Sequence, residues 1–337
     1  MTNKKKKKLD EKQADICSKF IRRFYGTVAL NDLESRNVED LFGSALSFWN
    51  FIYKRQLDET KIRIYNPDYE RHGWQSTHTI IEIIHEDMPF LVDSISMEIN
   101  RMGLTAHLII HMGGMFVKRN KQGAISHVEF SGESITDNYI PEAPIYIEIN
   151  RQTDPASLEN IKENLQRVLT DVRMAVKDWM PMCKKVSESI KQLEKSKKHL
   201  DKDELAESVD FLKWIQDHHF TFLGVRDYEL LKKDSESVLR PVLNSGMGIL
   251  SEKHVGKVPI SLLSRSPDAQ QMTSSSQILT ISKTNQRSTV HRPTSNDYLG
   301  MKLYDEKGNV VGERAFVGLY THDAYNVNPI DIPFLRR

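Results

Sequence analysis

Residues 77–111 read THTIIEIIHEDMPFLVDSISMEINRMGLTAHLIIH, and this stretch predicts a strand, a helix and a second strand. The β-branched run at Thr77–Ile84 indicates a strand that is buried on both faces. Asp87 offers a side-chain oxygen to cap the following helix, and Gly103 is suited to end it. The apolar stripe of this helix would comprise Leu91, Ile95, Ile99 and Met102. Apolar and polar residues then alternate through Leu104–His111, which predicts the second strand.

The segment that follows completes a candidate domain over residues 61–181. Its predicted strands are Met115–Arg119, Ile125–Phe130 and Ile145–Ile149. A long helix comes next, with Asp154 as its cap and Pro155 as its first residue. Apolar residues recur along it every three or four positions, at Leu158, Ile161, Leu165, Val168, Val172, Val176 and Trp179. This order of elements predicts an α+β sandwich of the ferredoxin-like kind on a largely antiparallel sheet.

The first 60 residues predict a tail and a pair of helices. Five consecutive lysines, Lys4 to Lys8, indicate a disordered basic tail over residues 1–9. Residues 10–60 predict a helical hairpin that is broken at Asn31-Asp32, with Asn37 as the cap of its second helix. The apolar faces of the two helices would consist of Ile16, Phe20, Phe24 and Val28, and of Leu41, Ala45, Phe48 and Ile52.

The C-terminal half predicts a linker and a second domain. Residues 182–202 contain seven lysines on a weak helical periodicity, so we interpret them as a solvated helical linker at a domain boundary. Residues 203–337 predict a second α+β domain with a mainly antiparallel sheet, opening with a helix at Asp203–His218. Its predicted strands are Phe220–Leu230, Ile278–Ser282, Ser288–His291, Tyr298–Tyr304 and Val310–Tyr320. The stretch from Ser235 to Gln277 has the composition of a loop.

Composition excludes several classes of protein. The 47 basic and 46 acidic side chains nearly cancel, so no global field attracts nucleic acid or acidic lipid. No apolar run approaches the ~20 residues of a membrane helix. Two cysteines, Cys17 and Cys183, cannot form a disulfide framework, which favours a reducing compartment. We therefore expect a cytoplasmic protein with no nucleic-acid partner and no membrane partner.

Motifs for metals and cofactors are absent from the sequence. His107 and His111 lie four residues apart on a predicted strand, a separation of ~13 Å that is too long for two ligands of one small ion. Gly246-Met247-Gly248 begins a G-x-G-x-x-G pattern, but Ser251 occupies its last position and no strand–turn–helix context surrounds it. We therefore expect no metal, no bound cofactor and no catalytic residue in this chain.

The turn between the first strand and the first helix of the candidate domain is the most plausible small-molecule site. N–H groups at a helix N-terminus and the helix dipole favour a carboxylate, and a carboxylate such as Asp87 can accept the ammonium of an amino acid. The candidate effector-binding residues are Asp87, Met88, Pro89, Phe90 and Leu91. The alternative, which the sequence leaves open, is that Asp87 only caps the helix and no ligand binds.

Several motifs carry a resemblance to a known family. HEDMPFLVDS at residues 85–94, followed by the strand that ends at His111, resembles the start of the large bacterial NAD-specific glutamate dehydrogenases, whose very long subunits begin with ACT-like regions. Asp87–Leu91 is similar to the ACT-domain turn, and Phe90 stands where many ACT domains have glycine. Further matches, in order, are FTFLG (220–224), RSTVHRP (287–293), DYLG (297–300), VGER (311–314), VGLYT (317–321), AYN (324–326) and IPFLRR (332–337). The resemblance covers about residues 20–337.

The resemblance implies a function for the longer protein. Family members oxidise L-glutamate with NAD and water to 2-oxoglutarate, ammonium and NADH, and they need a substrate lysine in a glycine-rich context and a nucleotide-binding βαβ unit. Neither pattern occurs in these 337 residues. We therefore expect a non-catalytic N-terminal regulatory and assembly region that stops before the catalytic core, where NAD would bind, and that is inactive alone. It would join the rest of the enzyme chain, form a homo-oligomer and take part in allosteric regulation by an amino-acid effector. The alternative is a purely structural oligomerisation module.

Overall fold

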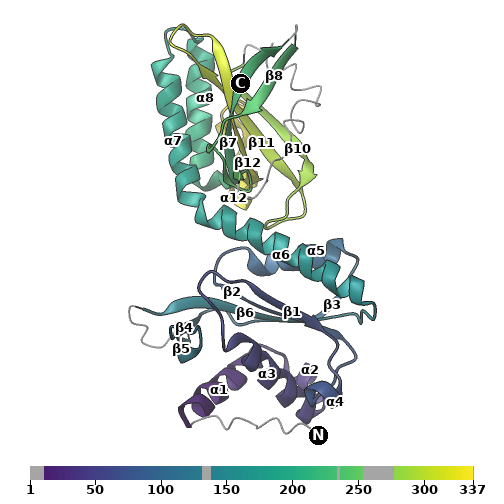
Figure 1. The fold of residues 1–337 in the computed structure, drawn as a ribbon. Coiled ribbons are helices and arrows are strands. Elements are labelled where there is room, and N and C mark those ends of the chain that lie inside the picture. Colours follow the sequence, from purple (N-terminus) through teal and green to yellow (C-terminus); the bar gives the residue numbers. More distant parts are fainter. Residues whose placement is uncertain (1–10, 131–137, 234–235, 253–276, 337) are drawn as a thin grey trace. The chain divides into compact units, whose positions relative to one another are not determined.

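The computed structural model describes residues 11–130, 138–233, 236–252 and 277–336. The predicted basic tail, residues 1–9, lies outside the described residues. The chain divides into two compact units, Met1–Leu169 and Thr170–Arg337, and the division falls inside helix α6 (Pro155–Lys177). Each unit combines helices with an antiparallel sheet, which confirms the predicted α+β class (Figure 1).

The predicted helical hairpin is present at the start of the first unit. Helices α1 (Glu11–Phe24) and α3 (Val38–Ile52) pair side by side, and the connection between them contains a short helix, α2 (Leu30–Glu34), in place of a simple turn. The side chain of Asn37 accepts hydrogen bonds from the N–H groups of Glu39 and Asp40, so its predicted role as the cap of α3 is confirmed.

The sheet of the first unit has ferredoxin-like connectivity. Its strands are β1 (Lys61–Tyr65), β2 (Thr79–Glu86), β3 (Ala106–His111), β4 (Met115–Arg119), β5 (Ile125–Phe130) and β6 (Ile140–Ile149). The order is β1-β2-β6; one half of β6 then pairs with β3 and the other half with the β4–β5 hairpin. Strand β2, helix α5 (Leu91–Arg101) and β3 thus form a βαβ unit split by β6. A short helix, α4 (Tyr69–His72), lies between β1 and β2.

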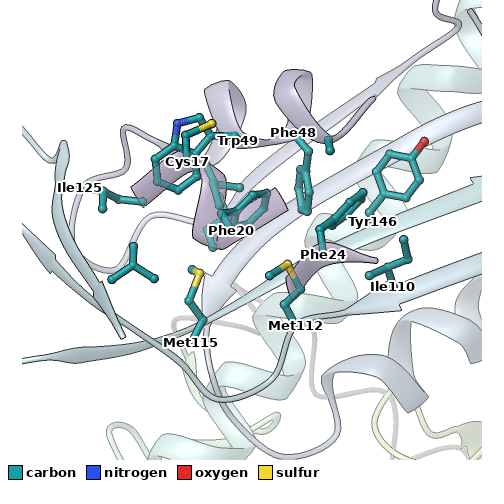
Figure 2. Close-up of a cluster of buried hydrophobic side chains, with 14 of the residues drawn as sticks. Cys17, Phe20, Phe24, Phe48, Trp49, Ile110, Met112, Met115, Ile125 and Tyr146 are labelled. Carbon is teal, nitrogen blue, oxygen red and sulfur yellow. The ribbon is translucent and has the colours of Figure 1, made fainter. Parts of the chain in front are cut away.

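Helices cover both faces of this sheet (Figure 1). Helices α5 and α6 lie on one face, and the hairpin lies on the other. Figure 2 shows the core on the hairpin side, where Phe24 and Phe48 contact Tyr146 of β6 and Phe20 packs against both phenylalanines. The hairpin is therefore a third layer of the first unit. Of the residues predicted to be buried along α6, Ile161, Leu165 and Val168 are buried, whereas Leu158 is half-exposed because it lies in the first turn of the helix.

The second unit packs helices against another antiparallel sheet, as predicted. Its helices are α7 (Trp179–Lys195), α8 (Lys202–Trp214), the π-turn η1 (Ile215–His219), α12 (His322–Asn326) and the 3-10 turn η2 (Pro329–Asp331). The sheet order is β10-β11-β12-β7-β8, with β9 beside β7. Its strands are β7 (Phe220–Lys233), β8 (Glu236–Pro241), β9 (Met247–Gly248), β10 (Leu279–Arg287), β11 (Ser295–Tyr304) and β12 (Val310–Tyr320).

Three local predictions in this half differ from the structure. Residues 182–202 are helical, but α7 buries Met182, Val186 and Leu193 in the core of the second unit, because a narrow apolar stripe runs among the lysines. Residues 288–291 are not a strand, since β10 ends at Arg287 and His291 adopts a φ of +71°. Residues 236–241, predicted as loop, pair with β7 as strand β8. In the last case β8 pairs with the strand directly before it, Lys233 opposite Glu236.

Candidate functional site

The predicted effector turn lies between β2 and α5. Strand β2 ends at Glu86, and α5 begins at Leu91. The N-cap residue of α5 is Phe90, whose side chain has no hydrogen-bonding atom, so the prediction that Asp87 caps this helix is wrong. Phe90 has a φ of +72°, in the left-handed region that favours glycine. This backbone conformation explains why glycine suits the equivalent position of many ACT turns.

The carboxylate of Asp87 faces the loop between β3 and β4. It accepts a long hydrogen bond, 3.4 Å, from the N–H of Gly114, and its own N–H donates to the carbonyl of Pro141. Burial lowers the pKa of His111, and the nearby charge of Asp87 opposes this shift. The structure therefore brings Asp87, His111 and Gly114 together beside the N-terminus of α5. Pro89 is exposed, Met88 and Phe90 are half-buried, and Leu91 is buried.

Three buried carboxylates lie on the hairpin-facing side of the same sheet. Glu82 of β2 and Glu142 and Glu148 of β6 are at most 2% exposed. Each forms an ion pair with arginine: Glu82 with Arg63, Glu142 with Arg55 and Arg119, and Glu148 with Arg36. Because burying an unpaired carboxylate is costly, these pairs are needed for the hairpin to cover this face.

The ion pair between Arg119 and Glu142 connects the hairpin to the sheet. Arg119 donates to both oxygens of Glu142, with Nε–Oε1 and Nη2–Oε2 distances of 2.7 and 2.6 Å. The same guanidinium donates to the carbonyls of Ile52 and Tyr53 at the C-terminal end of α3. Carbonyls at a helix C-terminus lack partners within the helix, so Arg119 satisfies them and ties the hairpin to the sheet. Nearby, burial raises the pKa of Glu82 to about 7, against the opposing effect of Arg63.

The third pair borders a cavity. Arg36 Nη1 lies 2.6 Å from Glu148 Oε1, which also accepts a hydrogen bond from the Tyr146 hydroxyl. The other oxygen, Oε2, is 3.5 Å from Nδ1 of His78 and has no hydrogen-bond partner in the described part of the chain. Burial lowers the pKa of His78, and the charge of Glu148 opposes this shift.

This cavity has a volume of about 330 Å³ and lies between the hairpin and the sheet. Trp74 also lines it, and the indole Nε1–H of this 2% exposed side chain has no acceptor among the described residues. Trp74 is seated against Gly43, where an added Cβ would lie 2.5 Å from the Trp74 Cβ. The full lining is Ser35, Arg36, Asn37, Asp40, Leu41, Ser44, Trp74, Gln75, Ser76, Thr77, His78, Tyr146 and Glu148.

The sequence predictions did not include this cavity. One signal was present, because Glu148 is a charged residue inside the apolar strand segment Ile145–Ile149, as Glu82 is inside β2. A carboxylate in a strand that is buried on both faces needs a cation from another segment. Arg36 has no such local signal, because it lies in the short connection between α2 and α3 and reaches Glu148 only in the folded chain.

His107 and His111 lie on a strand, as predicted. This strand is β3, and the ring of His107 packs against that of His78 with centroids 4.5 Å apart. His219 stacks on Trp214. Within residues 11–130, 138–233, 236–252 and 277–336, no cluster of three or more histidine, cysteine or acidic side chains is suited to a metal ion. No helix in those ranges is long and apolar enough to cross a bilayer.

Comparisons with known proteins match both units. Residues 20–165 match a family model described as glutamate dehydrogenase, ACT1 domain. The chain is 37% identical over 334 residues to the NAD-specific glutamate dehydrogenase of Halomonas elongata, an alignment that covers 98% of this chain and 20% of that protein. It is 34% identical to the NAD-specific glutamate dehydrogenase of Pseudomonas aeruginosa, over 97% of this chain and 20% of that protein. For the Mycobacterium tuberculosis protein of the same name, identity is 22%, over 76% of this chain and 15% of that protein. The chain thus spans about one fifth of the length of the first two relatives.

Proposed function

Since this chain belongs to the NAD-specific glutamate dehydrogenase family, we propose that it is a non-catalytic N-terminal regulatory and assembly region of such an enzyme. The observation that carries this proposal is the position of the ACT1 match. It covers residues 20–165, which are nearly the same residues as the first compact unit with its split βαβ sheet. The chain would work as part of a longer protein, in the cytoplasm, where the free cysteines Cys17 and Cys183 stay reduced.

The longer protein would oxidise L-glutamate with NAD and water to 2-oxoglutarate, ammonium and NADH. The names of the relatives support this assignment. The 337-residue sequence contains neither a dinucleotide fingerprint nor a lysine in a glycine-rich context. NAD and substrate would then bind outside this chain. Calorimetric titration with NAD should give no binding heat, and a turnover assay with glutamate and NAD should give no NADH. Formation of NADH by the pure chain would contradict the proposal.

We further propose that the β2–α5 turn, residues 87–91, contributes to binding an amino-acid effector. Its supporting features are a carboxylate at Asp87 for the ligand ammonium and the N-terminus of α5 for the ligand carboxylate. Amino acids should raise the melting temperature of the chain, because a ligand that binds only the folded state stabilises it.

The substitution Asp87→Asn tests whether the β2–α5 turn binds the effector. If the ammonium forms a charge-assisted bond with Asp87, this substitution weakens effector binding about tenfold or more. Stability without ligand should change by less than about 1 kcal/mol, because the 3.4 Å bond to Gly114 is long. Asp93→Asn, which removes an exposed charge from the first turn of the same helix, is the matched control. Equal binding by both variants would move the effector away from the turn.

A second candidate role is oligomerisation through strand β3. One edge of β3 pairs with β6, and no other described strand pairs with its opposite edge. An unpaired strand edge can extend a sheet into a second copy of the chain. Thr105 and His107 are exposed along it, and lysines at both positions would oppose such pairing. Light scattering should then report a smaller particle for the double variant, and an unchanged mass would exclude assembly through this edge.

A further inference from the structure

We infer that the outer face of α3, with the groove between α3 and α4, is an interface at which two copies of this chain pair their α3 helices antiparallel. The inference deepens the assembly role, and it rests on the proposed function only for its meaning in the longer enzyme. The surface lies entirely within the first unit, and no residue of β3 lines the groove.

Helix α3 carries apolar side chains on two faces. Its inner face, which includes Phe48 and Trp49, is buried in the core of the first unit. On its outer side, Val38, Phe42 and Leu46 follow one another at intervals of four residues, which places them in one row along the helix. Val38 is 77% exposed and Phe42 is 56% exposed. The outer face of a surface helix is normally polar, so this row indicates that another surface covers α3.

The groove beside this row is already formed in the single chain. It has a volume of about 720 Å³, and α4 provides its second wall. The hydroxyl of Tyr69 donates to Glu39 Oε2 at 3.0 Å, which ties α4 to the first turn of α3. The carboxylate of Asp68 caps α4 by accepting from the N–H of Arg71. Because these contacts hold both walls in place, association requires little ordering of the groove.

The groove is too open for a small molecule. Among the residues that line it, Val38, Phe42 and Tyr69 are 77%, 56% and 47% exposed. Small-molecule sites usually bury about 70–90% of their ligand, and walls this exposed cannot enclose one. An exposed apolar surface with a polar rim is typical of a contact between proteins.

The charges at the two ends of α3 favour a second copy as the partner. Glu39 lies in the first turn of the helix, whereas Lys54 follows its last turn. Arg63, which also pairs with Glu82, donates to the carbonyl of Ser47 in the C-terminal half. Two antiparallel α3 helices bring the acidic end of each copy to the basic end of the other and place their dipoles favourably. An unrelated partner would need these charges at matching positions, whereas a second copy supplies them by symmetry.

The α4 wall is compatible with the same pairing. Arg71 is 83% exposed, and its contact with Asp68 spans 3.9 Å. The ring of His72 packs against Tyr65 of β1. The guanidinium of Arg71 therefore has exposed donors for a carboxylate of the second copy, such as that of the exposed Glu34.

Sedimentation equilibrium of the 337-residue chain over a series of concentrations tests the inference. The mass should approach twice the 39.0 kDa of one chain. Val38→Lys and Phe42→Lys should each raise the dissociation constant of the dimer about tenfold or more, because symmetry places the new charge in the apolar contact twice. Both side chains are exposed, so both variants should keep the circular dichroism spectrum of the parent. Leu57→Lys, at a 69% exposed residue outside the groove, is the matched control and should dimerise as the parent does.

Substitutions at Asn50 test the antiparallel direction. Asn50 is exposed in the groove, and an axis between Phe42 and Leu46 brings it near Glu39 of the second copy. Asn50→Lys should lower the dissociation constant about threefold, because an exposed ion pair forms twice, and Asn50→Glu should raise it by a similar factor. The gain from Asn50→Lys should disappear in a chain that also carries Glu39→Gln.

The outcomes separate this inference from the proposed function. The mass of one chain at every concentration would overturn the α3 interface. A dimer that survives Phe42→Lys but is lost when Thr105 and His107 are replaced by lysine would also overturn it, and would keep an assembly role through β3. Equal dissociation constants for Asn50→Lys and Asn50→Glu would overturn the antiparallel arrangement. A dimer that is lost in Phe42→Lys supports the interface even if the chain forms NADH, a result that contradicts the proposed function alone.

Discussion

Different interactions hold the helices on the two faces of the first unit's sheet. On the side of α5 and α6, β2 and β6 present Ile81, Ile83, Ala143, Ile145, Ile147 and Ile149, all 0% exposed, and His85 next to the turn. On the hairpin side, the same two strands place Glu82, Glu142 and Glu148 among aromatic and aliphatic side chains. Both faces are covered by two helices, yet only the hairpin side contains a row of charged pairs from the sheet.

This difference separates contacts that only stabilise the unit from contacts that also define where the hairpin lies on the sheet. An apolar contact has no direction, so the sheet holds α5 and α6 through burial, and the ion pairs on this side, from Glu98 to Arg101 and Arg167, lie within and between the two helices. An ion pair with hydrogen bonds is directional, and it strongly disfavours any arrangement in which one charge is left unpaired. The hairpin position is thus defined by a few arginines that must meet given carboxylates. The end of the row where this matching is incomplete, at Glu148, is where the cavity lies.

The largest effect is expected at the centre of the charged row. Glu142→Gln keeps the shape of the side chain but leaves two buried arginines, Arg55 and Arg119, without their charge partner. The free energy of unfolding, measured by urea titration, should fall by about 3–5 kcal/mol. Glu159→Gln, at an exposed ion pair on α6, should change it by less than about 0.5 kcal/mol. A loss below about 1 kcal/mol at Glu142 would mean that the charges do not hold the hairpin.

On the apolar face, Leu165→Ala should lower the free energy of unfolding by about 2–5 kcal/mol, because it removes a fully buried side chain of α6 and leaves a cavity. Leu158→Ala on the same helix should cost less, because Leu158 is half-exposed. Urea titration of both variants measures the difference. Equal losses at the two positions would show that α6 is not packed on the sheet through Leu165.

The pH dependence of the free energy of unfolding also distinguishes the hairpin side of the sheet from the side of α5 and α6. The folded pKa of Glu82 is about 7, whereas its ordinary value is 4.5, so the folded state holds an extra proton between these values. The free energy of unfolding therefore falls as pH rises through this window, by on the order of 3 kcal/mol at about 1.4 kcal/mol per pKa unit. Glu82→Gln cannot ionise, so its stability relative to the parent should rise between pH 4.5 and 8. Parallel pH profiles for the two proteins would contradict the raised pKa.

The smallest effect is expected at the start of α3. Asn37→Ala removes the side chain that accepts from the N–H groups of Glu39 and Asp40, so the free energy of unfolding should fall by about 1 kcal/mol. Asn37→Asp keeps an acceptor and should restore most of this loss. If alanine and aspartate behaved alike, the hairpin would be held by its contacts with the sheet and not by its own helix signals.

Local patterns in the sequence predicted most of the elements of the first unit. The strand–helix–strand unit at residues 77–111, the caps at Asn37 and Asp154, and the antiparallel α+β class are all confirmed. These succeed because periodicity, capping and glycine stops act over a few residues. The cap assigned to Asp87 was wrong for the same reason: a local rule placed the helix start before Phe90, and the left-handed backbone of Phe90 moved it.

Two segments of the second unit were not predictable in this way. Strand β8 follows β7 directly and pairs with it, Lys233 opposite Glu236, although its composition is that of a loop. The apolar residues of α7 lie among lysines and are buried in the core of the second unit. The candidate cavity is the clearest case. Glu148 signals its need for a partner, but Arg36 is 112 residues away in sequence and meets it only after the hairpin covers the sheet. Family and fold class follow from local patterns in the chain, whereas the cavity depends on tertiary packing, because an ion pair across two layers has no signature in either segment alone.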